Sequence, residues 1–206
     1  MVNNHNIMVK NEKRSILKLL INESENEFTI REISKKRKIN YKSAYEAVKK
    51  LQGEGAIKLE KKGNITLCSF VKTLTPSTFL AEKERLNQAL RNKSLNVIYH
   101  ELYKLPVQFI ALLFGSYAKK KQKKQSDIDL LIISENAEKI EEKLSLVPEK
   151  LHITSISSVE FIEMFQSKEF SVVTEAIKNN IILIGLEDYY RFLENAIPRI
   201  DKTGRG

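Results

Sequence analysis

Two apolar runs in this sequence are joined by a polar segment, and the residues at the two joins constrain the fold more than any other feature. The first run, 107–114, leads into Gly115 and Ser116, and after ten further residues Asp127 and Asp129 open the second run. Short apolar runs bounded by turn residues are typical of buried strands. Alternate residues of a strand point to the same side, so the two carboxylates are expected to project together, while Ile128 and Leu130 are expected to face a core on the opposite side.

These residue types suit the binding of a nucleotide with a divalent cation. Mg²⁺ prefers oxygen ligands and is held by few carboxylates together with substrate phosphates, and two such cations can bridge a triphosphate. Gly115 lets the backbone approach a phosphate, and the Ser116 hydroxyl and nearby amides can bind its oxygens. Alone, an Asp-x-Asp pair is usually a solvated strand end and a Gly-Ser pair is a turn. The combination at this spacing is much more specific.

The segment ALLFGSYAKKKQKKQSDIDLLIIS resembles the signature of the polymerase-β nucleotidyltransferase superfamily and, more narrowly, the minimal nucleotidyltransferases of prokaryotes. The resemblance implies that Asp127 and Asp129 bind Mg²⁺ or Mn²⁺ and are catalytic. It also implies that Gly115 and Ser116 bind ATP or another NTP, with the Gly-Ser turn beginning a helix aimed at the triphosphate. The implied reaction transfers an NMP, with AMP expected, to a protein or another acceptor. Small relatives act as antitoxins beside HEPN-type partner proteins, so such a partner is implied as well.

One part of the family pattern is missing. The family usually has a third carboxylate on a later strand, whereas the strand predicted over 151–156 contains no acid, and His152 or Thr154 falls near the expected place. His152 either substitutes in part for that acid or is a structural residue of the strand. Two carboxylates can still bind Mg²⁺ with a nucleotide, but the loss could lower or abolish transfer. The alternative function is a transcriptional regulator whose degenerate transferase domain serves as a nucleotide sensor or oligomerisation module.

Basic residues are concentrated in two places. From Lys10 to Lys72 there are 16 Lys and Arg against 8 Asp and Glu, which accounts for nearly all of the formal net charge of +9. This distribution favours a polyanionic partner for the N-terminal third. A second group lies in the ten-residue gap, where it either contacts phosphates or a nucleic acid or forms a solvated helix face: Lys119, Lys120, Lys121, Lys123 and Lys124.

The N-terminal third predicts a helix over 12–22, a short helix over 30–37, a tight turn, a helix over 41–52 and a hairpin with its turn at 61–64. Thr29 and Glu32 are placed to form a capping box at the start of the short helix.

This order of elements resembles a winged helix-turn-helix over about 60 residues. DNA binding is the favoured use, and dimerisation or protein docking is the alternative. The predicted DNA-binding residues flank the short helix, line the third helix and occupy the hairpin tip: Lys36, Arg37, Lys42, Ser43, Tyr45, Lys49, Lys61 and Lys62.

We therefore predict an α+β protein with a winged helix-turn-helix at 1–75, one or two linking helices at 76–104 and a small mixed-sheet nucleotidyltransferase domain at 105–206. The linking helix is expected over 79–104, with a possible break near Asn92. The single cysteine, Cys68, excludes a disulfide within the chain, and its apolar neighbours predict a buried thiol. No apolar run is long enough to span a bilayer. These features favour a cytoplasmic protein that does not use a membrane, and a homo-oligomer is the expected assembly. A purely structural, protein-binding role is the least favoured function.

Overall fold

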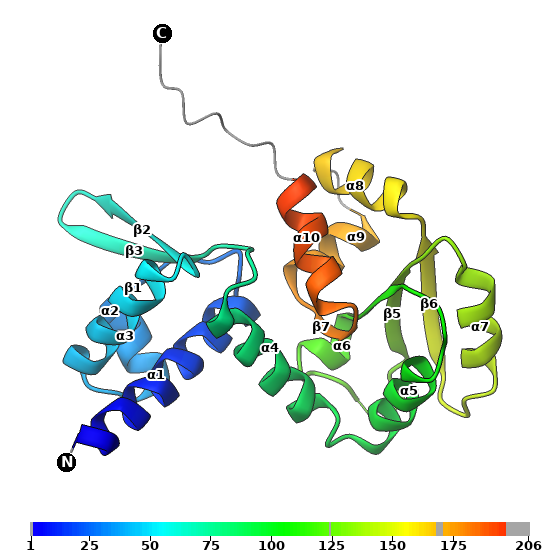
Figure 1. Cartoon of the computed structure of the whole chain (residues 1–206), viewed down its shortest axis with the longest axis horizontal. Coiled ribbons are helices and arrows are strands. Elements are labelled where there is room, and N and C mark those ends of the chain that lie inside the picture. Colours follow the sequence, from blue (N-terminus) through cyan, green and yellow to red (C-terminus); the bar gives the residue numbers. More distant parts are fainter. Residues whose placement is uncertain (1, 124, 168–170, 197–206) are drawn as a thin grey trace, which may run out of the picture.

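The N-terminal third folds into three helices and a small antiparallel sheet (Figure 1). The computed structural model describes residues 2–123, 125–167 and 171–196, with side chains from residue 11 onward. The elements of this unit are α1 (Val2–Asn22), β1 (Phe28–Thr29), α2 (Ile30–Arg37), α3 (Tyr41–Gly53), β2 (Ile57–Lys62) and β3 (Ile65–Phe70). The sheet has the order β1-β3-β2.

Local side-chain contacts set the boundaries of α2 and α3. Thr29 accepts a hydrogen bond from the backbone N of Glu32, and the Glu32 carboxylate accepts one from the backbone N of Thr29, so the predicted capping box is confirmed. These contacts lower the pKa of Glu32. Lys38 ends α2 in the left-handed conformation (φ 54°), and the side chain of Asn40 caps α3. The chain is thereby turned between the two helices at the predicted place.

Two predicted boundaries in this unit are wrong. Helix α1 starts at Val2 rather than near residue 12, because the polar residues before that point have no apolar stripe to reveal the helix. The hairpin turn is also shorter than predicted. Lys61 and Lys62 belong to strand β2, since Lys62 pairs with Ile65 and only residues 63 and 64 remain outside the strands.

The core of this unit lies between α1, α3 and the hairpin. Ile16, Leu20 and Leu51 are fully buried in it, and α1 packs along α3. Cys68 of β3 is buried in the same cluster, which confirms the prediction from its apolar neighbours. Burial raises the pKa of the Cys68 thiol to about 11, so the thiol is protonated and shielded.

Two helices connect the halves of the molecule: α4 (Pro76–Ala89) and α5 (Lys93–Tyr103). Thr75 caps α4, Pro76 occupies its first turn, and Asn92 caps α5. The helical segment predicted over 79–104 is therefore two helices, broken near Asn92 as anticipated. Helix α4 lies between the two halves (Figure 1) and contacts both α1 and β7.

The C-terminal half is built around a four-stranded mixed sheet with the order β6-β5-β4-β7. Strand β4 is antiparallel to both neighbours, while β5 and β6 are parallel. The strands are β4 (Ile110–Leu113), β5 (Ile128–Ile133), β6 (Leu151–Ile156) and β7 (Ile181–Ile184). The helices are α6 (Gly115–Ala118), α7 (Ala137–Ser145), α8 (Ser158–Ser167), α9 (Val172–Lys178) and α10 (Leu186–Ala196). A small mixed sheet with helices is the predicted α+β organisation for this half.

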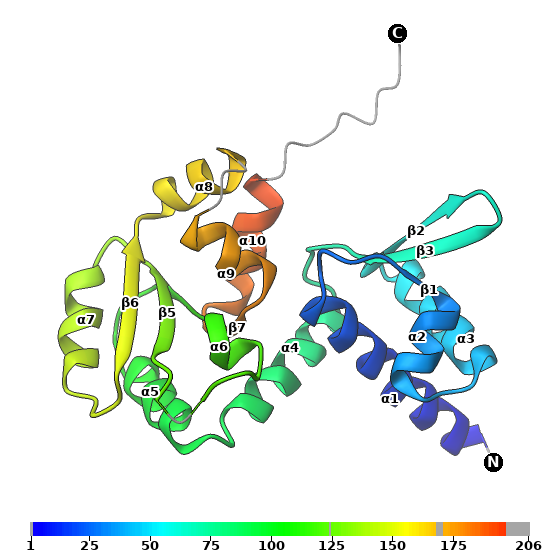
Figure 2. The same cartoon turned by 180° about the vertical axis from the view of Figure 1, so that it is seen from behind.

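Helices cover both faces of this sheet (Figure 2). Ile128, Leu130 and Ile132 of β5 pack in a cluster with residues of α5 and α7. Leu131 and Ile133 pack on the opposite face with residues of α8, α9 and α10. Alternate side chains of β5 therefore face opposite sides of the sheet, and each side packs against an apolar cluster. No helix in the described part of the chain is long and apolar enough to cross a membrane.

A buried polar network joins the two halves. The Arg85 guanidinium of α4 donates from Nε to Asn22 Oδ1 at 2.9 Å and also contacts Glu82 and the carbonyl of Asn180. The Tyr190 hydroxyl donates to Glu82 Oε1 at 2.8 Å. Arg85 and Glu82 are 4% exposed. Burial raises the pKa of Tyr190. Groups from α1, α4, the α9–β7 turn and α10 are thus held in one contact network.

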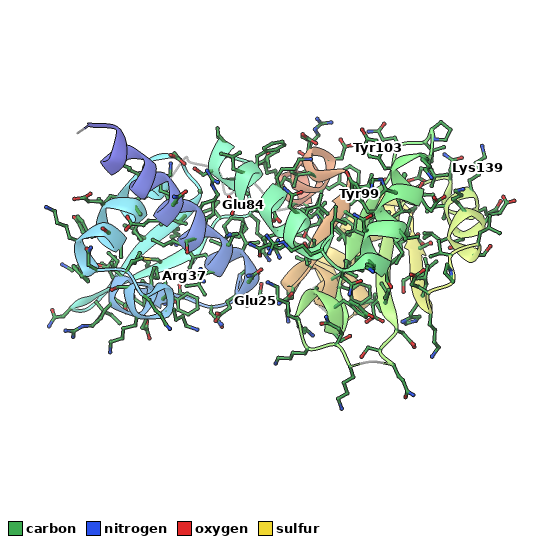
Figure 3. The ribbon with its side chains drawn as sticks, turned by 90° about the horizontal axis from the view of Figure 1, so that it is seen from below. Glu25, Arg37, Glu84, Tyr99, Tyr103 and Lys139 are labelled. Carbon is green, nitrogen blue, oxygen red and sulfur yellow. The ribbon has the colours of Figure 1, made fainter. Side chains whose placement is uncertain are left out.

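Half-buried ion pairs accompany this joint at the α1–α4 contact. Glu84 of α4, which is labelled in Figure 3, contacts Arg14 and accepts a hydrogen bond from Lys18 Nζ at 2.6 Å. Nearby, Ser24 donates to the carbonyl of Lys178 at 3.2 Å. The first unit is therefore attached to the second through α4 and through the α9–β7 turn.

Candidate functional site

The turn after β4 brings a glycine directly under a carboxylate. The Phe114 backbone N donates to the Asp129 carbonyl at 3.0 Å, which ties the turn to β5. Gly115 has φ +65°, a conformation that residues with a Cβ rarely adopt. A Cβ at this position would overlap Asp129 Oδ2 and lie 2.9 Å from its Cγ. Gly115 is therefore required both by the backbone and by the position of the Asp129 carboxylate.

The two aspartates lie at the start of β5. The strand begins at Ile128, one residue later than predicted, so Asp127 flanks the strand and Asp129 lies within it. Ile128 between them is buried in the core on the opposite side, as predicted. The Asp127 side chain is 40% exposed and the Asp129 side chain 25%. Both side chains are therefore partly accessible to solvent, although the Oδ1 atom of Asp127 is itself buried.

Lys150 contacts Asp127. Its Nζ lies 2.8 Å from Asp127 Oδ1 and 3.0 Å from Oδ2, and only the Oδ2 contact has hydrogen-bond geometry. The Lys150 carbonyl accepts from the Ile128 backbone N at 3.0 Å, which holds the two segments together. Sequence analysis did not select this lysine. Its only sequence signal is its place one residue before the strand that pairs with the Asp-x-Asp strand.

His152 lies beside Asp129. The parallel register of β5 and β6 pairs the two residues, and His152 Nδ1 lies 3.2 Å from Asp129 Oδ1. The imidazole is 65% exposed, so His152 does not fill a core. Thr154, the other residue considered for this place, pairs with Leu131 further along the strand. Of the two, His152 is thus the one that stands next to the Asp pair.

The donor set fits a divalent cation that also binds substrate. Among the described residues, no three His, Cys, Asp or Glu side chains form a group that could hold a metal by themselves. Asp127 and Asp129 nevertheless offer carboxylate oxygens at one place, and Asp127 Oδ1 has no hydrogen bond. The Lys150 ammonium shows that a cation can approach Asp127 closely. Two carboxylates completed by water and phosphate oxygens are a usual environment for Mg²⁺.

The segment between Ser116 and Asp127 is less helical than expected. Helix α6 contains only Gly115–Ala118, so the implied helix beside Ser116 is a single turn. The lysines that follow form an exposed loop, and the alternative of a solvated helix face is wrong for Lys120, Lys121 and Lys123. Lys119 Nζ contacts Glu175 of α9 at 2.8 Å. Lys124 lies outside the described residues.

The residues predicted to bind DNA fall into two groups. Lys42, Tyr45 and Lys49 are exposed along α3, with Ser43 half-buried at its start, and Lys61 is exposed on β2. Three of the predicted residues contact side chains of other segments: Lys36 Nζ lies 3.2 Å from Glu23 Oε1, Arg37 Nε donates to Ser15 Oγ at 2.8 Å, and Lys62 Nζ lies 2.9 Å from Glu27 Oε2. Lys49 Nζ donates to Gln52 Oε1 of its own helix at 2.9 Å. The contact with Glu27 raises the pKa of Lys62. Figure 3 labels Arg37 in this unit.

A groove of about 430 Å³ lies between α3 and the β2–β3 hairpin. Tyr41, Tyr45 and Lys49 line it from α3, Arg31 from α2 and Ile65 from the hairpin. Both tyrosines and Ile65 are well exposed. Sequence analysis missed Arg31 and Ile65 as members of this surface. An arginine early in α2 carries no distinctive signal until the hairpin is placed opposite it.

One family model matches a segment of the C-terminal half. Residues 97–188 match the family model described as Polymerase beta, Nucleotidyltransferase. The match takes in residues 97–103 of α5, the four strands of the mixed sheet, and the glycine turn with the two aspartates. It supports the nucleotidyltransferase superfamily for this segment. Such families generally use an NTP and a divalent metal. The first 96 residues lie outside the matched range. No curated protein and no solved structure gave a significant match.

Proposed function

We propose that the C-terminal half binds an NTP, in the first instance ATP, with Mg²⁺ or Mn²⁺ and transfers the NMP to an acceptor with release of pyrophosphate. The observation that carries this proposal is the position of the Asp129 carboxylate directly over Gly115. This position puts an oxygen of Asp129 that can bind a metal next to the Gly115 backbone, which can approach a phosphate. The family match over 97–188 supports the same reaction class.

Each residue of the site has a separate task in this reaction. Asp127 and Asp129 provide the oxygen ligands for the cations, and the Ser116 hydroxyl and the backbone of the glycine turn bind phosphate oxygens. Bound divalent cations supply charge neutralisation of the triphosphate and activation of the attacking oxygen. His152 stands beside Asp129 and partly replaces the third carboxylate of the family by accepting the proton of the acceptor hydroxyl.

The transfer reaction is tested with ATP labelled in the α-phosphate, Mg²⁺ and candidate acceptors, including a HEPN-type partner protein. Labelled acceptor should form with the wild-type chain and be lost in Asp127→Asn and Asp129→Asn, which keep side-chain volume. Asp188→Asn is the matched control, because Asp188 contacts Gln108 of the β4 end rather than the glycine turn. Equal labelling by the Asp127 and Asp129 variants would refute the proposal.

We also propose that the N-terminal unit is a winged helix-turn-helix that binds DNA. The observation that favours this function is the order of three helices and a hairpin, with Lys42, Tyr45 and Lys49 exposed along α3. A helix of this size fits the major groove, and the lysines suit the phosphate backbone. The groove beside the hairpin adds Arg31 to the same surface.

DNA binding is tested by gel-shift titration over a range of salt concentrations. Affinity for the specific site should fall as salt rises, because phosphate contacts release counterions. The absence of any sequence preference at moderate salt would leave docking or dimerisation as the use of this unit. A homo-oligomer is part of the proposal and is tested by sedimentation of the same preparation.

The combined function is a DNA-targeted regulator of the antitoxin type whose second domain is a cytoplasmic transferase. The competing proposal is a regulator in which the transferase fold only senses nucleotide. The observation that motivates it is that His152, rather than an acid, pairs with Asp129 in the sheet. The two are separated by one comparison. A sensor would change its DNA affinity when ATP and Mg²⁺ are added, yet would label no acceptor.

A further inference from the structure

Lys150 makes the closest charged contact at the candidate site. Its ammonium lies 2.8 Å and 3.0 Å from the two oxygens of Asp127. The lysine side chain is 80% exposed, while Asp127 is 40% exposed. The backbone at Lys150 is held by the hydrogen bond from Ile128. A change in the partner of Lys150 therefore requires only rotation of its flexible side chain.

The Asp127 carboxylate cannot hold this ammonium and a divalent cation in direct contact at the same time without strong repulsion between the two cations. Like charges a few ångströms apart repel, and a divalent cation attracts the carboxylate more strongly than a monovalent one. Among the described residues, Lys150 contacts no carboxylate other than Asp127. Two other acids of this half already have basic partners, since Asp129 contacts His152 and Glu175 contacts Lys119.

We propose that Lys150 is an exchangeable counter-cation of the nucleotide site, which pairs with Asp127 and moves to the nucleotide phosphates when Asp127 binds the divalent cation. This inference rests on the proposed nucleotide-binding function. The triphosphate is the anion that enters together with the cation, and a lysine ammonium on a four-carbon stem suits a phosphate oxygen. Lys150 is thus a positioning residue that both weakens metal binding in the absence of nucleotide and strengthens nucleotide binding.

The exchange predicts two effects of opposite sign for Lys150→Gln, which keeps much of the side-chain length but removes the charge. Mn²⁺ alone, followed by electron paramagnetic resonance, should bind about threefold to tenfold more tightly, since an exposed ion pair makes a modest contribution. The α,β-methylene analogue of ATP with Mg²⁺, followed by calorimetry, should bind about tenfold more weakly, because a charge-assisted hydrogen bond is lost.

Two further variants act as controls. Lys104→Gln removes an exposed lysine that contacts Glu101 within the same half, so both affinities should match the wild type. Lys150→Arg keeps the charge and should restore much of the nucleotide affinity. In an Asp127→Asn background, Lys150→Gln should no longer tighten Mn²⁺ binding, because the competition for that carboxylate has been removed.

The outcomes separate this inference from the proposed reaction. Unchanged Mn²⁺ affinity in Lys150→Gln would overturn the exchange, and tighter Mn²⁺ binding with unchanged nucleotide affinity would overturn the move to phosphate. A wild-type chain that binds neither probe would overturn both the exchange and the proposed function. Opposite shifts without any labelled acceptor would support the exchange and refute transfer.

Discussion

The two halves of the molecule assemble their candidate functional surfaces in different ways. In the N-terminal half, the exposed residues of α3 come from one continuous segment, and its position is set by the cap at Asn40 and the apolar stripe of the helix. In the C-terminal half, the site joins the turn at 115–116, the strand start at 127–129 and the segment 150–152. A surface built from one helix is set mainly by local interactions, whereas a site built from three segments depends on strand register.

The largest expected effect comes from the buried network that joins the halves. Arg85→Met leaves Glu82 buried without its guanidinium partner, so the free energy of unfolding should fall by about 3–5 kcal/mol. Urea unfolding followed by circular dichroism measures this change. Two separated transitions would show that each half folds by itself, and a loss below about 1 kcal/mol would show that the network contributes little.

A second experiment compares one glycine from each half. Gly115→Ala should lower the free energy of unfolding by about 1–3 kcal/mol and abolish labelling, because φ is positive and the new Cβ overlaps Asp129. Gly53→Ala is the matched control, since no neighbouring atom lies within 4 Å of a Cβ at this helical position. This control should stabilise the chain by about 0.5–1 kcal/mol. Equal effects at both positions would contradict the proposed special role of the glycine turn.

The capping box tests how far local contacts determine the N-terminal half. Thr29→Ala should lower the free energy of unfolding by about 1 kcal/mol, because the backbone N of Glu32 loses its acceptor. Labelling of the acceptor should stay at the wild-type level in the native chain. Thermal unfolding and the labelling assay measure the two quantities, and a parallel loss of labelling would show that α2 influences the distant site.

The smallest effects are expected on DNA binding. Lys49→Ala should weaken binding and reduce the salt dependence by about one unit of slope if Lys49 contacts a phosphate. Lys36→Ala should change the slope less, because Lys36 Nζ is already held by Glu23 and lies 5.2 Å from the centre of the Phe28 ring. Gel-shift titrations of both variants make the comparison. A larger change for Lys36 would mean that its contacts are given up on binding.

Several elements could be predicted because their signals are local. The Thr29 capping box and the break at Asn92 both depend on residues within a few positions of one another. Strand β4 was predicted over 107–114 but covers only Ile110–Leu113, which are the residues that pair with β5 and β7. The length of a strand is decided by its neighbours as well as by its own composition.

The residues of the candidate site also divide into those with a local sequence signal and those whose role depends on strand pairing. The Gly-Ser turn and the two aspartates were recognised from spacing, while Lys150 was not, because its approach to Asp127 requires the parallel pairing of β5 and β6. The exposure of His152 also depends on β6 lying at the edge of the sheet. In the N-terminal half, sequence analysis could not show that Lys36, Arg37 and Lys62 are held by other side chains.

The sequence by itself determined the helix caps and the alternation that turns Asp127 and Asp129 away from Ile128. These features follow from backbone geometry and hydrogen bonds over a few residues. Only the tertiary structure decided that Lys150 meets Asp127, that His152 meets Asp129, and that Lys36 and Lys62 pair with acids of other segments. Those contacts join residues far apart in the chain, and they depend on sheet register and helix packing, which no local pattern encodes.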